Sequence, residues 1–130
     1  MDIVQNGIVL KTEYYKECLN FYCNVLDLPV VFSEDHGTWS ITCLAIGEGY
    51  LMVETGGNAA PPEKTFAQSP IKLRLNVSNL AKEVEIMREK GIIISIQEHD
   101  WGEVAEICDP DGNRIALRQD TDIYRLKQRD

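Results

Sequence analysis

The sequence predicts a single α+β domain that consists of two β-α-β-β-β modules. The hydrophobic pattern changes from the two-residue period of a strand to the longer period of a helix, and then returns to short strand-like runs. The same order of periods recurs in the second half, and a stretch rich in Gly and Pro separates the halves. We place module one at residues 1–55, the linker at 56–70 and module two at 71–130, all within one domain of 130 residues.

The first half begins with an alternating strand over residues 7–12. Apolar residues then recur at three- and four-residue steps over residues 13–26, which predicts an amphipathic helix. Thr12 is placed to cap the start of this helix, and Pro29 follows its end. Three further strands are expected at residues 30–32, 39–46 and 50–54, with a polar loop between the first two.

The second half begins with a clean alternation over residues 72–77. A helix is predicted over residues 79–90, because Ser78 or Asn79 can cap its start and Gly91 stands where a glycine commonly ends a helix. A strand is expected at residues 92–96, followed by a loop. The chain then forms a hairpin around the D-P-D-G turn at residues 109–112, since alternating runs flank this turn on both sides.

Composition and charge exclude several classes of function. The formal net charge of −8 argues against binding to nucleic acid or to an anionic membrane. The longest apolar run, residues 92–94, is far too short to span a bilayer, and the N-terminus lacks the pattern of a signal peptide. The four cysteines show no C-x-x-C spacing and are expected to be reduced. We therefore expect a cytoplasmic protein.

Three motifs give the chain a family resemblance. Residues 21–28 are similar to a helix end of the form F-Y-x-x-V-L-G-L, with Asp27 in place of the usual Gly, and residues 80–91 resemble the helix of the second module. Trp101-Gly102 followed by D-P-D-G-N at residues 109–113 resembles a closing hairpin. Together they resemble the vicinal oxygen chelate superfamily, which includes glyoxalase I, bleomycin-resistance proteins and extradiol dioxygenases. The resemblance implies two modules whose strands form a curved mixed sheet around a shared cleft.

The resemblance also implies four positions at which related proteins hold a metal ion. Only the carboxylate of Glu54 among them can bind a divalent cation, and one carboxylate does not supply the ligands that such an ion needs. Gln5 shares a face with Gly7, the first of these positions, and is the one further residue that could add a ligand. The four positions fall on Gly7, Glu54, Lys72 and Ala116.

We therefore expect neither a metal nor another cofactor. His36 and His99 fall in predicted loops, where solvent-exposed histidines are common, so we do not count them as ligands. We further expect the ammonium of Lys72 to lie within ion-pair distance of Glu54, since the family's ligand positions converge on one centre.

The side chains that share these faces form the candidate ligand site. Arginine suits a carboxylate or phosphate, because its planar fork offers two parallel hydrogen bonds. The alternative is a solvated face with scattered ion pairs, and a tryptophan that only anchors its loop on the core. The predicted ligand-binding residues are Tyr50, Met52, Glu54, Lys72, Arg74, Trp101, Arg114 and Arg118.

Three functions follow from these residues and this resemblance. The first is a metal-free protein that binds a small molecule with an anionic or carbonyl group. The second is a metal-dependent enzyme of the glyoxalase or dioxygenase kind, and the third is a protein-interaction domain without a ligand. Whether the chain catalyses a reaction stays open, because one fold hosts many chemistries. We also expect a homodimer, since small modules expose sheet edges that association can cover.

Overall fold

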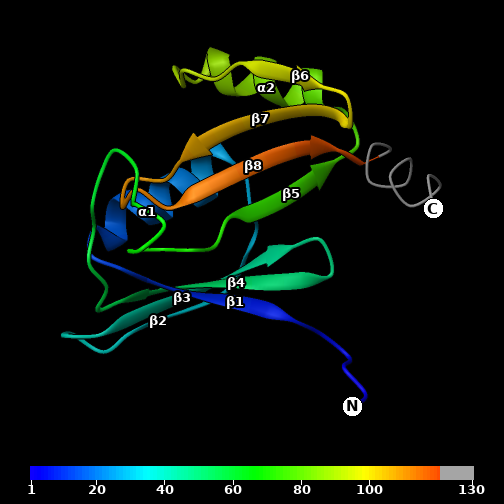
Figure 1. Cartoon of the computed structure of the whole chain (residues 1–130). Coiled ribbons are helices and arrows are strands. Elements are labelled where there is room, and N and C mark those ends of the chain that lie inside the picture. Colours follow the sequence, from blue (N-terminus) through cyan, green and yellow to red (C-terminus); the bar gives the residue numbers. More distant parts are fainter. Residues whose placement is uncertain (121–130) are drawn as a thin grey trace. The chain divides into compact units, whose positions relative to one another are not determined.

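The computed structural model describes residues 1–120 and contains two four-stranded mixed sheets, each with its own helix (Figure 1). The chain divides into two compact units. Unit 1 comprises residues 1–62 together with 110–112, and unit 2 comprises residues 63–109 together with those from 113 onward. The two predicted β-α-β-β-β modules are thus present, and the α+β fold class is confirmed.

Sheet 1 belongs to unit 1 and has the strand order β1-β4-β3-β2. Strand β1 runs parallel to β4, whereas β2, β3 and β4 form an antiparallel meander. The bounds are β1 (Gly7–Thr12), β2 (Val30–Asp35), β3 (Ser40–Ile46) and β4 (Gly49–Thr55).

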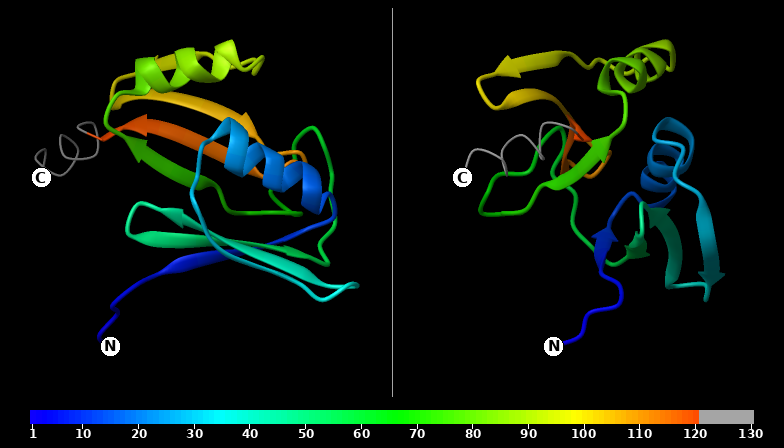
Figure 2. Two further views of the ribbon diagram at one scale, coloured as in Figure 1. Left: turned by 180° about the vertical axis from the view of Figure 1, so that it is seen from behind. Right: turned by 90° about the vertical axis from the view of Figure 1, so that its right-hand side faces the viewer.

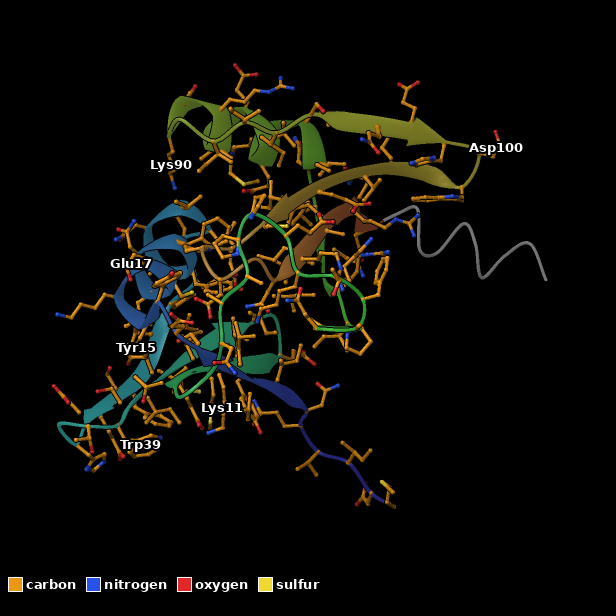
Figure 3. The ribbon with its side chains drawn as sticks, turned by 60° about the vertical axis from the view of Figure 1, so that its left-hand side comes forward. Lys11, Tyr15, Glu17, Trp39, Lys90 and Asp100 are labelled. Atoms are coloured by element: carbon orange, nitrogen blue, oxygen red, sulfur yellow. The ribbon has the colours of Figure 1, made fainter. Side chains whose placement is uncertain are left out.

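Helix α1 (Tyr15–Asn20) continues as one π-helical turn, η1 (Phe21–Val25), so that the two together cover most of the predicted helix. The core of unit 1 includes the fully buried side chains of Tyr22, Leu51 and Val53. Tyr15 projects from α1 toward the sheet (Figure 3), where its hydroxyl lies 2.7 Å from that of Thr42 on β3. These contacts place α1 on one face of sheet 1.

Sheet 2 belongs to unit 2 and repeats the topology with the order β5-β8-β7-β6. Strands β5 and β8 are parallel, and the remaining pairs are antiparallel. Helix α2 runs along one face of this sheet (Figure 2) and buries Leu80, Val84 and Met87. The bounds are β5 (Leu73–Val77), α2 (Leu80–Glu89), β6 (Ile96–His99), β7 (Gly102–Cys108) and β8 (Arg114–Gln119).

The predicted signals at the ends of α2 are confirmed. The side-chain oxygen of Asn79 accepts a hydrogen bond from the backbone N–H of Lys82 at 3.1 Å. Gly91 follows the helix with a φ of +86°, a conformation that a residue with a side chain rarely adopts. Asp27 also has a positive φ, of +55°, at the position where the family motif has Gly. The turn is therefore kept although the glycine is not.

The structure contradicts the local predictions for residues 92–95 and for Thr12. Residues 92–95 do not form a strand, because β6 begins only at Ile96 and the carbonyl of Ile94 instead accepts a hydrogen bond from Arg88 Nε at 2.9 Å. Thr12 does not cap α1, because its hydroxyl donates to the carbonyl of Glu54 at 2.8 Å. The hydroxyl of Thr12 thus bonds to a distant strand, whereas the carbonyl of Ile94 is bound from the helix that directly precedes it.

The start of α1 is capped by Asp111, from the far end of the sequence. Its fully buried carboxylate accepts hydrogen bonds from the backbone N–H groups of Glu13 at 2.8 Å and Tyr14 at 2.9 Å. Its own carbonyl accepts a third bond from Ala60 N–H at 2.9 Å. Asp109 closes the turn itself, since its two carboxylate oxygens bind the backbone and side-chain nitrogens of Asn113. The D-P-D-G-N motif thus has one aspartate for the turn and one for α1.

The helices of residues 1–120 are all short, and none of them has the length and apolar character of a membrane-spanning segment.

Candidate ligand-binding site

Of the eight predicted site residues, three lie on one face of sheet 1 in unit 1 and three lie on one face of sheet 2 in unit 2. On β4, the buried Leu51 and Val53 alternate with Tyr50, Met52 and Glu54, which therefore point to the face away from α1. We call this the helix-free face of sheet 1. The parallel register of β1 with β4 adds three residues to the same face, namely Gly7 opposite Tyr50, Val9 opposite Met52 and Lys11 opposite Glu54.

Glu54 forms an ion pair with Lys11, its register partner on β1. The ammonium lies 2.7 Å from the carboxylate, and the Glu54 side chain is only 13% exposed. Lys72, in unit 2, forms an ion pair of 3.1 Å with Glu106. Glu54 and Lys72, which were predicted to pair with one another, thus each have a partner within their own unit. The Lys72–Glu54 ion pair, which would join the two units, stays a prediction.

The aromatic ring of Tyr50 lies directly over Gly7. A Cβ atom added to Gly7 would come within 2.3 Å of two atoms of this ring, which is far inside van der Waals contact. The ring thus occupies the space that any side chain at position 7 would need. Since the family resemblance places a metal ligand there, the chain has an aromatic surface where related proteins have a donor.

Unit 2 presents cationic side chains on the helix-free face of sheet 2. Ile115 and Leu117 on β8 alternate with Arg114, Ala116 and Arg118, and Arg74 on β5 lies opposite Ala116. Arg114 and Arg118 are only 6% and 4% exposed, whereas Arg74 is exposed. A solvated face therefore describes Arg74 but not the two arginines of β8.

Arg118 brings Trp101 onto this face. Its Nη2 donates to the carbonyl of Trp101 at 3.0 Å, and its guanidinium carbon lies 4.4 Å from the centre of the Trp101 ring. The imidazole of His99 is also stacked on Trp101, with ring centres 4.5 Å apart and planes 12° from parallel. His99 was predicted to lie in a loop, but it is the last residue of β6. The H-x-W spacing of His99 and Trp101 is the sequence pattern from which this stack could have been predicted.

Arg114 holds the segment that precedes β5. Its Nη1 donates to the carbonyl of Lys64, and its Nη2 donates to the carbonyls of Ser69 and, at 3.3 Å, Ile71. Its guanidinium carbon also lies 4.3 Å from the centre of the Phe66 ring. We call residues 63–71 the strap. Sequence reasoning missed it, because this linker-like stretch has no periodicity.

Cys108, the register partner of Arg114 on β7, contacts the start of the strap. Its thiol donates to Glu63 Oε1 at 3.5 Å. Burial, the hydrogen bond to Glu63 and the negative charge of Glu63 together raise the pKa of this thiol from 9.0 to about 11. The thiol is therefore neutral, and weakly nucleophilic, at physiological pH.

This raised pKa predicts how the thiol reacts and how stability depends on pH. Because the folded-state pKa exceeds the unfolded one, the contribution to stability is fully present below pH 9 and is lost as the pH rises toward 11. We expect alkylation of Cys108 by iodoacetamide, followed by peptide mass spectrometry, to be slow at pH 8. Glu63→Gln should lower the pKa and speed the reaction, and an unchanged pH profile would contradict the role of Glu63.

The residues present do not fit a divalent metal at the four positions that the resemblance implies. Gly7 and Ala116 carry no donor, Lys72 is a cation, and Glu54 already binds the ammonium of Lys11. Within residues 1–120, no three His, Cys, Asp or Glu side chains gather closely enough to hold a metal ion. The amide nitrogen of Gln5 donates to the carbonyl of Glu48 at 3.1 Å, so only its side-chain oxygen could be added to Glu54, and two oxygen donors are still fewer than a divalent ion needs.

His36 also lies apart from these positions. It is in the turn of the β2–β3 hairpin, where its Nε2 lies 3.1 Å from Glu34 Oε2 and its ring is stacked on Trp39. Figure 3 shows Trp39 at the tip of that hairpin, away from Lys11 on β1. The contacts of His36 therefore lie within the β2–β3 hairpin.

Comparisons with solved structures agree on the fold. Glyoxalase I from Leishmania major has 16% sequence identity and a TM-score of 0.71, and the match covers 95% of this chain and 91% of the enzyme. The fosfomycin resistance protein FosX from Mesorhizobium loti has 14% identity and a TM-score of 0.71, with 98% and 99% covered. The antibiotic-binding protein TnmS3 from Streptomyces sp. CB03234 has 17% identity and a TM-score of 0.69, with 92% and 98% covered.

A comparison with curated protein sequences gives no significant match. The family model described as the Glyoxalase/Bleomycin resistance protein/Dioxygenase superfamily matches residues 5–117. This match includes both modules and the closing hairpin, so the resemblance drawn from the three motifs is confirmed. The chain belongs to the Glyoxalase/Bleomycin resistance protein/Dioxygenase superfamily.

Proposed function

We propose that the protein binds a small molecule with an anionic or carbonyl group, without a catalytic metal. The observation that carries this proposal is the burial of Arg114 and Arg118 on the helix-free face of sheet 2, where both guanidinium groups donate to backbone carbonyls. A carbonyl is a weaker partner for a guanidinium than a carboxylate or phosphate oxygen. Such a ligand would therefore gain more from these arginines than the backbone does.

The other predicted site residues supply the remaining contacts in this proposal. Tyr50, Met52 and Trp101 offer apolar and aromatic surface, which commonly lines small-molecule sites. Arg74 is the exposed cation that meets an anion first. Within its own unit, Glu54 is neutralised by Lys11 and Lys72 by Glu106. The fold likeness to the antibiotic-binding protein TnmS3 and to the fosfomycin resistance protein supports a binding role of this kind.

Two other functions compete with this one. A metal-dependent enzyme would need ligands that the four implied positions do not offer, since Glu54 is the one oxygen donor among them. A protein-interaction domain would leave the buried arginines as purely structural groups. Metal content separates the first alternative from the proposal, and stabilisation by a small molecule separates the second.

A thermal-shift screen tests the proposal. The panel contains inorganic phosphate, benzoate, fosfomycin and bleomycin, each with and without EDTA. A ligand at one hundred times its Kd adds about 2.7 kcal/mol to stability, so we expect a rise in Tm of several degrees for at least one anionic compound, unchanged by EDTA. Arg114→Gln and Arg118→Gln should reduce the shift, whereas Lys82→Gln, at an exposed position of α2, should not. A panel without any shift would contradict the proposal.

We also propose that the protein forms a homodimer through the outer side of β2. This strand is an edge of sheet 1, and Val30, Val31 and Phe32 are 54%, 61% and 41% exposed. The register shifts between Val30 and Phe32, which interrupts the edge, so we expect side chains rather than strand pairing to make the contact. Sedimentation at micromolar concentration should show twice the 14.7 kDa mass, and Val31→Lys should give the monomer. A wild-type monomer would contradict the proposal.

A cytoplasmic location completes the proposal. The four cysteines all lie within residues 1–120, and the structure shows no disulfide between them. Reduced thiols are typical of that compartment.

A further inference from the structure

We infer that the strap, residues 63–71, is a displaceable cover over an oxyanion site on Arg114. In this inference, which rests on the proposed function, a carboxylate or phosphate oxygen takes the place of strap carbonyls on the guanidinium. Binding of the anion therefore frees the end of the strap that Ser69 and Ile71 anchor and weakens the hold of sheet 2 on the rest of it. Three features of unit 2 support this, namely the anchors of the strap, its internal structure and the unused edge of the guanidinium.

The strap is anchored on sheet 2 by two side chains. Arg114 binds the carbonyls of Lys64, Ser69 and Ile71, which lie at both ends of the strap, and the Cys108 thiol binds Glu63. These anchors bind backbone carbonyls or an exposed carboxylate. An anion that competes for the guanidinium thus competes with the main polar attachment of the strap.

The strap also contains hydrogen bonds of its own. The backbone N–H groups of Gln68 and Ser69 both donate to the carbonyl of Thr65, and the Gln68 side chain accepts a bond from Thr65 N–H at 2.8 Å. Phe66 is 72% exposed and Ile71 is 59% exposed, so little apolar surface would be uncovered when the strap moves. A self-contained turn with few buried side chains can leave the sheet as one piece.

The guanidinium of Arg114 has an edge that the strap leaves unused. Its Nε atom is buried and has no hydrogen-bond partner, and no carboxylate lies within ion-pair distance of Arg114 in the described part of the chain. A buried donor without an acceptor is costly, and a buried cation gains most from a partner of opposite charge. An oxyanion on the Nε–Nη2 edge would satisfy Nε and displace Ser69 and Ile71 from Nη2 in one step.

The negative charge of Glu63 also favours anion binding to the form in which the strap is released. Its carboxylate lies near the Cys108 thiol at the start of the strap, on the strand next to Arg114. A negative charge there opposes the approach of an anion while the strap is closed. Release of the strap removes this charge along with the carbonyls, so the open form is the one that favours the anion.

Trypsin cleavage after Lys64 measures the release of the strap. Fragments are identified by mass spectrometry in inorganic phosphate and in chloride of equal ionic strength, and the cleavage sites within β5 and α2 report any general unfolding. We expect phosphate to speed cleavage after Lys64 severalfold in the wild type. Arg114→Gln should be cleaved fast in both salts, Arg114→Lys should lie between, and Lys82→Gln should behave as the wild type does.

The outcomes separate this inference from the proposed function. Stabilisation by phosphate that requires Arg114, with an unchanged rate of cleavage after Lys64, would overturn the strap as a cover and leave the binding function intact. Fast cleavage in Arg114→Gln without any effect of phosphate on the wild type would overturn the oxyanion site. Cys108 provides a second readout, because strap release should speed its alkylation at pH 8 in parallel with cleavage.

Discussion

Replacing Asp111 by Ala is expected to lower the free energy of unfolding by about 2–3 kcal/mol. The fully buried carboxylate accepts the backbone N–H groups of Glu13 and Tyr14, and the alanine leaves both donors without their acceptor. Urea denaturation followed by far-UV circular dichroism measures the loss. Asp111→Asn keeps one side-chain oxygen and should lose about half as much.

Asp100→Asn is the matched control for this prediction. Asp100 lies in the turn between β6 and β7, at the exposed end of that hairpin (Figure 3), so its replacement should change stability by less than about 0.5 kcal/mol. If Asp111→Ala were as stable as Asp100→Asn, the cap on α1 would contribute nothing, and the reason for the second aspartate of the motif would have to be sought elsewhere.

Replacing Gly7 by Ala is expected to cost about 1–3 kcal/mol, because the new Cβ atom would overlap the ring of Tyr50. The ring must leave its position on the helix-free face of sheet 1. Thermal unfolding gives the loss of stability, and near-UV circular dichroism reports the displaced tyrosine.

A double-mutant cycle identifies the cause of that loss. Tyr50→Ala removes the ring, so Gly7→Ala should cost almost nothing in the Tyr50→Ala background. If the two changes were additive, the overlap would not be the reason why glycine stands at this position.

Local patterns were enough to predict most of the fold. The alternation over residues 72–77, the helix with Asn79 and Gly91 at its ends, and the D-P-D-G turn all depend on neighbours in sequence, and the structure confirms them. The strand expected at residues 92–96 is the exception among these local patterns, because β6 begins only at Ile96. Three consecutive isoleucines have high strand propensity, but the segment returns from α2 and its carbonyl at Ile94 is bound by Arg88.

The contacts of the candidate site were harder to predict, because they join residues far apart in the sequence. Alternation alone puts Lys11 on the face of Gly7, but only the parallel register of β1 with β4 brings it to Glu54. The burial of Arg118 against Trp101 likewise requires β7 to pair with β8, which puts Arg118 opposite Val104, close to the turn that contains Trp101. The residue types of the site could thus be predicted, whereas their partners could not.

The cap on α1 is the clearest example of a contact that joins residues far apart in the sequence. The residue that caps α1 in place of Thr12 is Asp111, which is 97 positions away from Tyr14 in the sequence. The family motif marks Asp111, but turn chemistry explains only Asp109, Gly112 and Asn113. An aspartate in a turn whose carboxylate is not needed by that turn is the signal that sequence reasoning could have used.

We propose that this member of the superfamily binds its ligand without a metal, because Lys11 pairs with Glu54 and the other three family positions carry no suitable donor. Elemental analysis of untagged protein, incubated with excess Zn²⁺, Ni²⁺, Mn²⁺ or Fe²⁺ and then desalted, tests it most directly. We predict far less than one ion per chain for each metal. About one ion per chain that is lost in Glu54→Gln would contradict the claim and would favour the metal-dependent enzyme.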